Sequence, residues 1–420
     1  KMSETAYLDS CYCAGKADLC SVFLTRGLQL AARGGISAML TMRAWMFLRQ
    51  FYALRESIVE DSFIWTLGDF AVGAFDDVPN DVLSVVASLI ANGISWEGRS
   101  TAQLPTPPGD RSYDRQRTRR KISATISGEG VHDFNVAEVA RIPGSPIIHW
   151  WTDEQISRFL DCPSLGEIHE IRTGLTTCDN TRFTRRPWEP SVRSADMKGM
   201  PSRWNATIMG GKGRQWIEPV SDVILWEFSG LEQKVYQELN YGSVSKHVRS
   251  PDKYFKKGIA FSMIGDTFCA RAHRVPSIFG SKGSSVFPEN LPEVLCAMNS
   301  GFARRTLEDL NPGIGFEVGD VARMPLVQIK NAEKIFDTLE TEFSRHETAR
   351  EPSPEFICPG SSGWEYVQKW AQQAVDRAEG APLPEYIEEL DPEPPTDHLS
   401  FALGVALGRF SPVDEHGQPA

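Results

Sequence analysis

Arginine and aromatic side chains lie close together near the middle of the chain. Arg182, Arg185 and Arg186 fall within a few residues of one another, next to Phe183 and Trp188. An arginine can bind guanine through two hydrogen bonds in the major groove, or it can clamp a backbone phosphate. Most hydrogen bonds between proteins and DNA go to the backbone, so phosphate contact is the expected role for each arginine. Solvated surface charge is the alternative.

A second basic set lies among short strand-like segments. It consists of Lys256, Lys257, Arg271 and Arg274. The same two interpretations apply to these side chains, namely contact with DNA and plain surface charge. The sequence does not tell which of the basic residues meets a base edge and which meets a phosphate.

The distribution of charge supports a nucleic-acid contact more than the total does. The net charge is −11. Residues 99–285, however, hold 27 Lys and Arg against 20 Asp and Glu, so the rest of the chain carries the acidic excess. A basic middle between acidic ends is typical of a DNA-contacting module in an otherwise acidic protein. A mixed surface with an acidic tail is the alternative.

The cysteines do not predict a metal centre. Cys11 and Cys13 form a Cys-x-Cys pair and Cys20 follows, but no second pair or histidine stands at zinc spacing. We therefore expect no metal, and reduced thiols in a cytoplasmic protein. No apolar run reaches the roughly 20 residues that span a bilayer, so no membrane segment is expected either.

Helices and strands alternate over residues 17–91. An amphipathic helix is expected from about Asp18 to Gly34-Gly35, where a glycine supplies the left-handed turn that closes a helix. A second helix is expected over 45–58. Its apolar residues are Trp45, Phe47, Phe51, Leu54 and Ile58.

Three strands accompany these helices. They are expected at 36–41, 63–68 and 82–90, and the loop between the last two holds Phe75. This alternation predicts an α/β fold for the beginning of the chain.

The composition divides the chain into four stretches. The α/β pattern occupies 1–97, and a basic, proline-bearing linker is expected at 98–131. Its basic run, which is a solvated face or a contact with backbone phosphates, consists of Arg111, Arg115, Arg117, Arg119, Arg120 and Lys121. Residues 132–325 are rich in aromatic residues, glycines and short strand-like segments. Residues 326–420 form a helical region with an acidic tail.

Three groups of short motifs follow one another along the chain. The first group is Lys16–Phe23, Gly34-Gly35, Thr41–Leu48, Leu54–Glu56, Leu67-Gly68 and Ala74-Phe75; the second is Thr173–Leu175 with Asp179–Phe183; the third is Phe255–Ile259, Phe268, Arg271, Gly283–Phe287, Leu310–Pro312, Val318–Asp320 and Met324-Pro325. In this order they resemble adenine-specific DNA methyltransferases of the Asn-Pro-Pro-Tyr type, and most of all the PglX methyltransferases of BREX phage-defence systems.

The resemblance implies a fold for each stretch. Residues 1–97 would be the back half of a Rossmann-like class I methyltransferase domain. A mixed α+β target-recognition domain and the C-terminal helical region would follow. The family's glycine-bearing cofactor loop and its Asn-Pro-Pro-Tyr tetrapeptide are missing from these 420 residues and are expected upstream of Lys1, so we interpret Lys1-Met2-Ser3 as an internal cut. We expect this chain alone to be inactive.

The resemblance also implies roles for three residues. Phe75 would stack on an adenine swung out of the duplex; plugging the sheet edge is the alternative. Phe23 would pack against the adenine of S-adenosylmethionine, whereas plain helix core, shared with Leu19 and Leu30, is the alternative. Asp18 lies at the start of the same helix near the cofactor, and its residue type also suits a helix N-cap.

Three functions are open on the sequence. The first is a piece of an adenine-N6 DNA methyltransferase that uses S-adenosylmethionine and double-stranded DNA and marks host DNA in phage defence. The second is a non-catalytic DNA-specificity module working with other phage-defence proteins. The third is a fused restriction-modification enzyme, although no nuclease cluster stands out in this sequence.

Overall fold

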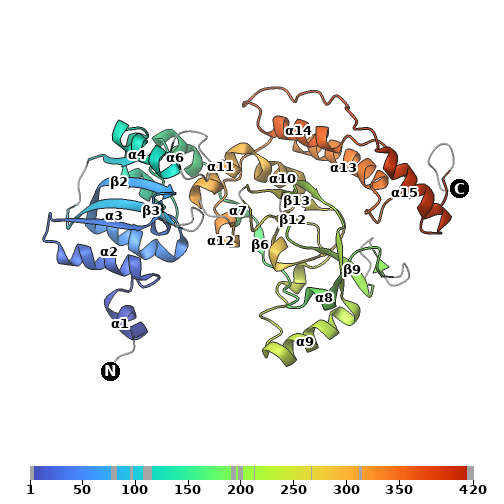
Figure 1. Ribbon diagram of the computed structural model, residues 1–420, viewed down its shortest axis with the longest axis horizontal. Coiled ribbons are helices and arrows are strands. Elements are labelled where there is room, and N and C mark those ends of the chain that lie inside the picture. The colour runs from blue at the N-terminus through green and yellow to red at the C-terminus, as the bar shows by residue number, and fades with distance from the viewer. Residues whose placement is uncertain are drawn as a thin grey trace. The chain divides into compact units, whose positions relative to one another are not determined.

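The chain forms two compact units (Figure 1). The computed structural model describes residues 4–76, 83–94, 98–106, 116–190, 195–196, 202–211, 213–265, 267–311 and 315–413. The first unit comprises Lys1–Asp161 with Asp309–Pro312, and the second comprises Cys162–Glu308 with Gly313–Ala420. Each unit buries its own hydrophobic residues.

The first unit is built on a mixed sheet. Its described strands are β1 (Ile36–Met42), β2 (Ser62–Val72), β3 (Ser84–Asn92), β4 (Ser100–Gln103) and β5 (Val131–Phe134). They lie in the order β1-β3-β2-β4-β5. β3 runs antiparallel to both β1 and β2, so β1 and β2 point the same way; β4 is parallel to β2, and β5 is antiparallel to β4.

Helices and short 3₁₀ turns accompany this sheet. They are α1 (Glu4–Cys11), α2 (Leu19–Leu30), η1 (Arg43–Met46), η2 (Arg49–Phe51), α3 (Tyr52–Asp61), α4 (Arg117–Ser127), α5 (Val136–Ala140) and α6 (Asp153–Leu160). The expected α/β character and the three expected strands are confirmed. The first helix is also confirmed, but it ends at Leu30, and Gly34 lies in the turn that follows it.

The expected continuous helix over 45–58 is wrong. Its first half consists of the turns η1 and η2, and only α3 is regular. The buried guanidinium of Arg55 explains the break, because it donates hydrogen bonds to the carbonyl oxygens of Trp45 and Leu48 at 2.9 and 2.8 Å. Those oxygens would accept i→i+4 bonds in a continuous helix.

The expected linker at 98–131 is also wrong where the structure describes it. β4 and α4 lie inside it, and β4 pairs with β2. Arg111 and Arg115 of the basic run lie outside the described residues. Arg117 and Lys121 are buried against the sheet, so the charge of this run did not signal a solvated loop.

The second unit contains two further sheets. The described strands are β6 (Glu170–Arg172), β7 (Thr184–Arg185), β8 (Ala195–Asp196), β9 (Trp204–Ile208), β10 (Trp216–Glu218), β11 (Asp222–Leu225), β12 (Ile259–Phe261), β13 (Ala270–His273), β14 (Ile278–Phe279) and β15 (Ser285–Phe287). One sheet has the order β10-β13-β12-β15-β6, and the other has the order β14-β9-β11-β7, with β8 paired to β9.

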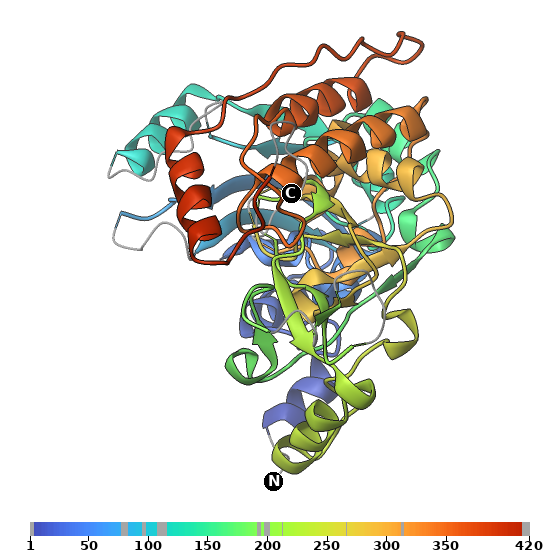
Figure 2. The same cartoon turned by 90° about the vertical axis from the view of Figure 1, so that its right-hand side faces the viewer.

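The helices of this part of the chain are mostly in its second half. They are α7 (Leu165–Ile168), α8 (Asn180–Phe183), α9 (Leu231–Tyr241), α10 (Leu291–Asn299), α11 (Gly301–Leu310), α12 (Val318–Val321), α13 (Ala332–Ala349), α14 (Trp364–Val375) and α15 (Pro395–Ala406), with 3₁₀ turns η3 (Glu227–Ser229), η4 (Pro251–Lys253) and η5 (Ser281–Gly283). α13 and α14 lie side by side (Figure 1, Figure 2).

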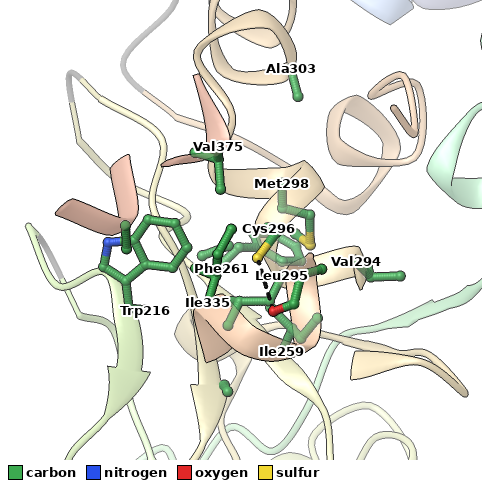
Figure 3. Close-up of a cluster of buried hydrophobic side chains, with 14 of the residues drawn as sticks. Trp216, Ile259, Phe261, Val294, Leu295, Cys296, Met298, Ala303, Ile335 and Val375 are labelled. Atoms are coloured by element: carbon green, nitrogen blue, oxygen red, sulfur yellow. Dashed lines mark hydrogen bonds between the residues drawn. The ribbon is translucent and has the colours of Figure 1, made fainter. Parts of the chain in front are cut away.

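The C-terminal helices share one core with the sheets, which corrects the expected boundary at 325/326. Ile335 of α13 and Val375 of α14 belong to the same buried cluster as Trp216 and Phe261 (Figure 3). The Cys296 thiol in α10 donates to the carbonyl oxygen of Ala332 at the start of α13. The region after 325 is therefore part of the second unit.

Candidate functional site

Phe75 lies at the mouth of an apolar cavity in the first unit. Its side chain is 39% exposed, in the loop that follows β2. The cavity has a volume of about 260 Å³ and is lined by Leu40, Phe70, Ala74, Phe75, Val85, Thr118, Lys121, Ile122, Thr125 and Ile126. Leu40 and Phe70 lie near the carboxyl ends of β1 and β2. In α/β folds this is the edge at which ligands bind.

Helix α4 holds the Phe75 loop. The Lys121 ammonium, 3% exposed, donates to the Phe70 carbonyl oxygen at 2.8 Å. The Thr118 hydroxyl donates to the Gly73 carbonyl oxygen at 3.1 Å. Gly73 has a φ of +80°, and a Cβ on it would lie 2.8 Å from Arg117 Cδ, so only glycine fits beneath this helix. The basic run thus fixes the backbone beside Phe75.

A buried network of Asp69, Arg43 and His149 holds the C-terminal end of β2 in place. Asp69 is fully buried and accepts three hydrogen bonds of 2.7–2.9 Å from Arg43, and His149 Nε2 lies 3.1 Å from its carboxylate. Its Oδ1 also accepts the amide of Ala71, where β2 has an irregular register and a φ of +48°. A bulge of this kind re-aims the chain that follows. The network therefore sets where the Phe75 loop leaves the sheet.

Burial and hydrogen bonding shift the pKa of Asp69 in opposite directions. Burial raises the pKa of the Asp69 carboxyl, but the hydrogen bond from His149 and the charge of Arg43 outweigh it and lower this pKa to about 2. Burial lowers the pKa of His149, against the opposing effect of Asp69. His132 Nε2 lies 2.9 Å from His149 Nδ1 and continues the chain toward the surface. Sequence reasoning missed Asp69 and the two histidines, because they are far apart along the chain.

Asp18 and Phe23 both lie on or beside α2. The Asp18 carboxylate accepts the amide of Cys20 at 2.7 Å and caps the helix, as its residue type suggested. Phe23 is 62% exposed, and Leu19 and Leu30 are exposed too, so the alternative of plain helix core is wrong. Phe23 is not among the residues that line the cavity at Phe75.

In the first basic set Arg182 and Arg186 are exposed and Arg185 is half-buried, and each of the three has a partner within the unit. Arg182 pairs with Glu232 at 2.8 Å, and Arg186 pairs with Asp222 at 3.1 Å. Arg185 donates to the carbonyl oxygens of Thr181 and Thr184. Surface ion pairs of this kind contribute little to stability, so Arg182 and Arg186 can exchange their carboxylates for other anions at small cost.

The second basic set divides into surface and interior residues. Lys256 and Lys257 are exposed. Arg271 is fully buried, where it forms an ion pair with Glu218 and donates to the Met209 carbonyl oxygen at 3.0 Å. The expectation that Arg271 contacts DNA is therefore corrected, since its guanidinium holds β13 to β10 in the interior.

The described residues contain neither a metal-binding cluster nor a membrane-spanning helix. No group of three or more His, Cys, Asp and Glu among them is placed to hold a metal ion, and Cys11 and Cys13 are simply exposed. No helix in that part of the chain is long and apolar enough to cross a membrane.

Two curated proteins align with most of the chain. The adenine-specific methyltransferase BrxX of Escherichia coli O9:H4 (strain HS) is 26% identical over 348 residues, 80% of this chain and 28% of that protein. The adenine-specific methyltransferase PglX of Lacticaseibacillus casei (strain Zhang) is 27% identical, over 78% of this chain and 28% of that protein. The chain resembles PglX-type adenine-specific methyltransferases. It spans little more than a quarter of the length of either relative. No family model matches it.

Solved structures give a weaker likeness. DrdV, in a complex with DNA, is 12% identical with a TM-score of 0.45, over 80% of this chain and 40% of that one. The type IIL restriction-modification enzyme MmeI, also in complex with DNA, is 11% identical with a TM-score of 0.44, over 85% of this chain and 48% of that one.

Proposed function

We propose that the chain is part of an adenine-N6 DNA methyltransferase that acts on double-stranded DNA and marks host DNA in phage defence. The observation that carries this proposal is the half-exposed ring of Phe75 over an apolar cavity at the carboxyl edge of β1 and β2. The names of the two curated relatives support the reaction class.

The chemistry requires an aromatic surface at such a place. The N6 amine of adenine is hydrogen-bonded inside the duplex, so the base must leave the stack before it can be methylated. Unstacking costs a few kcal/mol, and stacking on an aromatic ring returns on the order of 1–3 kcal/mol. Phe75 would supply that ring. Lys121 and Thr118 would hold its loop in place through the backbone oxygens that they bind.

The strand order supports the finer fold assignment. β1, α3 and β2 form a parallel crossover in which one strand position is skipped, and antiparallel β3 fills it. We infer that these elements are the back half of a Rossmann-like class I methyltransferase sheet. S-adenosylmethionine would supply the methyl group. The exposed ring of Phe23 fits contact with the adenine of that cofactor, and Asp18 would act by ordering the start of α2.

The second unit would hold the DNA. We assign this role to the exposed cations Arg182, Arg186, Lys256 and Lys257 and to the half-buried Arg185. A non-catalytic DNA-specificity module is the second candidate, because all of these cations lie in the unit that does not contain Phe75.

Replacing Phe75 in the full-length protein tests the proposal. Loss of 1–3 kcal/mol of stacking predicts that Phe75→Ala lowers the rate of adenine methylation about 5- to 150-fold. DNA affinity should stay near that of the unchanged protein. Tyr52→Ala is the matched control, since Tyr52 is an exposed aromatic residue of the same unit at 41% exposure. Unchanged turnover in Phe75→Ala would remove the stacking role.

The two candidate functions separate in the same assay. Transfer of a labelled methyl group to duplex DNA by the full-length protein supports the enzyme. DNA binding at 50 mM salt without any labelling supports the specificity module, and absence of binding at that salt removes both.

A further inference from the structure

Helix α9 has its polar side inward and its apolar side outward. Gln233 and Gln237 are fully buried, whereas Leu231, Val235 and Leu239 are 55%, 48% and 80% exposed. A surface helix of a globular protein normally has the opposite arrangement. The three outward residues are four positions apart, so they form one stripe along the helix. Figure 1 shows α9 at the margin of the second unit.

The glutamines on the inward face of α9 do not stabilise the folded unit as apolar residues would. Gln237 donates to the Thr176 carbonyl oxygen at 2.8 Å. The side-chain amide of Gln233 has no hydrogen-bond partner among the described protein residues. A buried amide without a partner is costly, and an apolar residue there would cost less. The outward stripe is therefore not explained by packing within this unit.

A strained turn adds a fourth apolar side chain to the stripe. Phe228 is 79% exposed with a φ of +50°, and Ser229 next to it has a φ of +57°. Such conformations cost of order 1–3 kcal/mol for each residue that is not glycine. Gly230 follows in the same region, and a Cβ on it would lie 2.5 Å from the Trp226 ring. The turn therefore fits only this sequence pattern, and it leaves the Phe228 ring in solvent.

These side chains line one groove. Its volume is about 620 Å³, and Phe228, Leu231, Val235 and Leu239 form its apolar lining. Its remaining lining residues are Arg182, Leu225, Glu227, Gly230, Glu232, Tyr236 and Asn240. A hydrophobic groove of this kind is what an amphipathic helix of a partner enters with its apolar face.

The rim of the groove decides between possible occupants. Glu232 and Glu238 precede and follow Val235 by three positions and so flank the stripe on both sides, and Glu227 lies at one end. The lining holds two carboxylates, Glu227 and Glu232, against one guanidinium, Arg182, so a DNA phosphate is disfavoured there. A second copy of the chain would add the same carboxylates to the interface, which disfavours it as well. The charge pattern fits a partner with lysine or arginine beside its apolar residues.

We propose that this groove docks an amphipathic helix of a partner protein, whose apolar stripe packs on Phe228, Leu231, Val235 and Leu239. The lysine or arginine residues of that helix pair with Glu238, and they replace Arg182 at Glu232 and Arg203 at Glu227, where the present ion pairs are exposed and exchange at small cost. Such a site is separate from the Phe75 cavity and from the exposed cations Arg186, Lys256 and Lys257. Of the residues assigned to DNA, Arg182 is shared with this site, because it lines the groove and pairs with Glu232.

A designed peptide tests the site on the 420-residue chain. The probe is an 18-residue helical peptide with leucine on one stripe and lysine elsewhere, labelled for fluorescence anisotropy. We expect it to bind, and we expect the double variant Leu231→Ser/Leu239→Ser to weaken binding at least tenfold. Leu407→Ser is the matched control, since Leu407 is 84% exposed outside the groove and should leave binding unchanged. Glu232→Gln/Glu238→Gln should weaken binding and lessen its dependence on salt.

Four outcomes would overturn the proposal. The first is equal affinity for the unchanged chain and the Leu231→Ser/Leu239→Ser variant. The second is equal binding of a peptide with glutamate in place of lysine. The third is a loss of duplex-DNA binding or of self-association in the same variant, which would make DNA or a second copy the occupant. The fourth is binding of the peptide to this chain but not to the full-length protein, which would make another segment of that protein the occupant.

Discussion

Two runs of basic residues, one at 117–121 and one at 182–186, lie in opposite environments. In the first, Arg117 and Lys121 are buried, and Lys121 binds the Phe70 carbonyl oxygen of β2, shortly before the Phe75 loop. In the second, Arg182 and Arg186 are about half exposed and pair with carboxylates at the surface. A cation turned inward therefore positions a loop, whereas a cation turned outward is available to another molecule.

The largest effect is expected at the most deeply buried cation. Arg271→Met removes the buried partner of Glu218, whose side chain is only 5% exposed and keeps only the half-exposed Arg214 as a partner. Breaking a buried pair in this way lowers the free energy of unfolding by about 3–5 kcal/mol. Urea unfolding monitored by fluorescence measures it. The double variant Arg271→Met/Glu218→Gln should recover part of the loss, because it leaves no uncompensated charge. If Arg271→Met is as stable as the unchanged chain, the inward role of this arginine is wrong.

Lys121→Met tests whether the inward run positions the Phe75 loop. The variant leaves the Phe70 carbonyl oxygen and the Thr106 hydroxyl without their ammonium donor. A buried acceptor left without a donor costs about 1–3 kcal/mol. In the full-length protein, methylation should fall while DNA affinity and its salt dependence stay unchanged. If the slope of log DNA affinity against log salt concentration is lowered instead, Lys121 contacts DNA, and the first basic run does not differ from the second in this respect.

Asp69 makes the free energy of unfolding depend on pH in the acid range. Its pKa is lowered to about 2 from an ordinary value of 3.8, so the stabilisation is present above about pH 4 and is lost as the pH falls toward 2. The loss amounts to about 2 kcal/mol. We expect Asp69→Asn to reduce the change in unfolding free energy between pH 6 and pH 2 by that amount. Glu365→Gln, which removes an exposed carboxylate paired with Lys369, should leave this change as it is.

The periodic parts of the chain were predictable from its sequence. Strands β1, β2 and β3 have long apolar runs, and α2 has a recognisable N-cap in Asp18. Phe75 could be placed at the end of β2 because the position follows from chain order. The stacking role itself rested on the resemblance to a family, and it stays a prediction.

The parts that failed depend on contacts between distant residues. Nothing local to Arg271 says that Glu218 will pair with it in the interior, and nothing near 117–121 says that β2 will pair with β4 and bury this run. Ile122 and Ile126 are four residues apart, and this helical spacing could have indicated α4 inside the expected linker. The outward stripe of α9 was missed because apolar residues at helical spacing are usually assigned to the core.

The smallest effect on stability, and the sharpest test of the outward run, is expected from Arg186→Ala. The guanidinium is half exposed and pairs with Asp222 at the surface, so its removal should change the free energy of unfolding by less than about 1 kcal/mol. If it contacts a phosphate, the variant weakens binding equally on all duplex sequences and reduces the slope of log affinity against log salt by about 1. Binding titrations at several salt concentrations measure this slope. An unchanged slope would leave Arg186 as plain surface charge and remove it from the DNA contact.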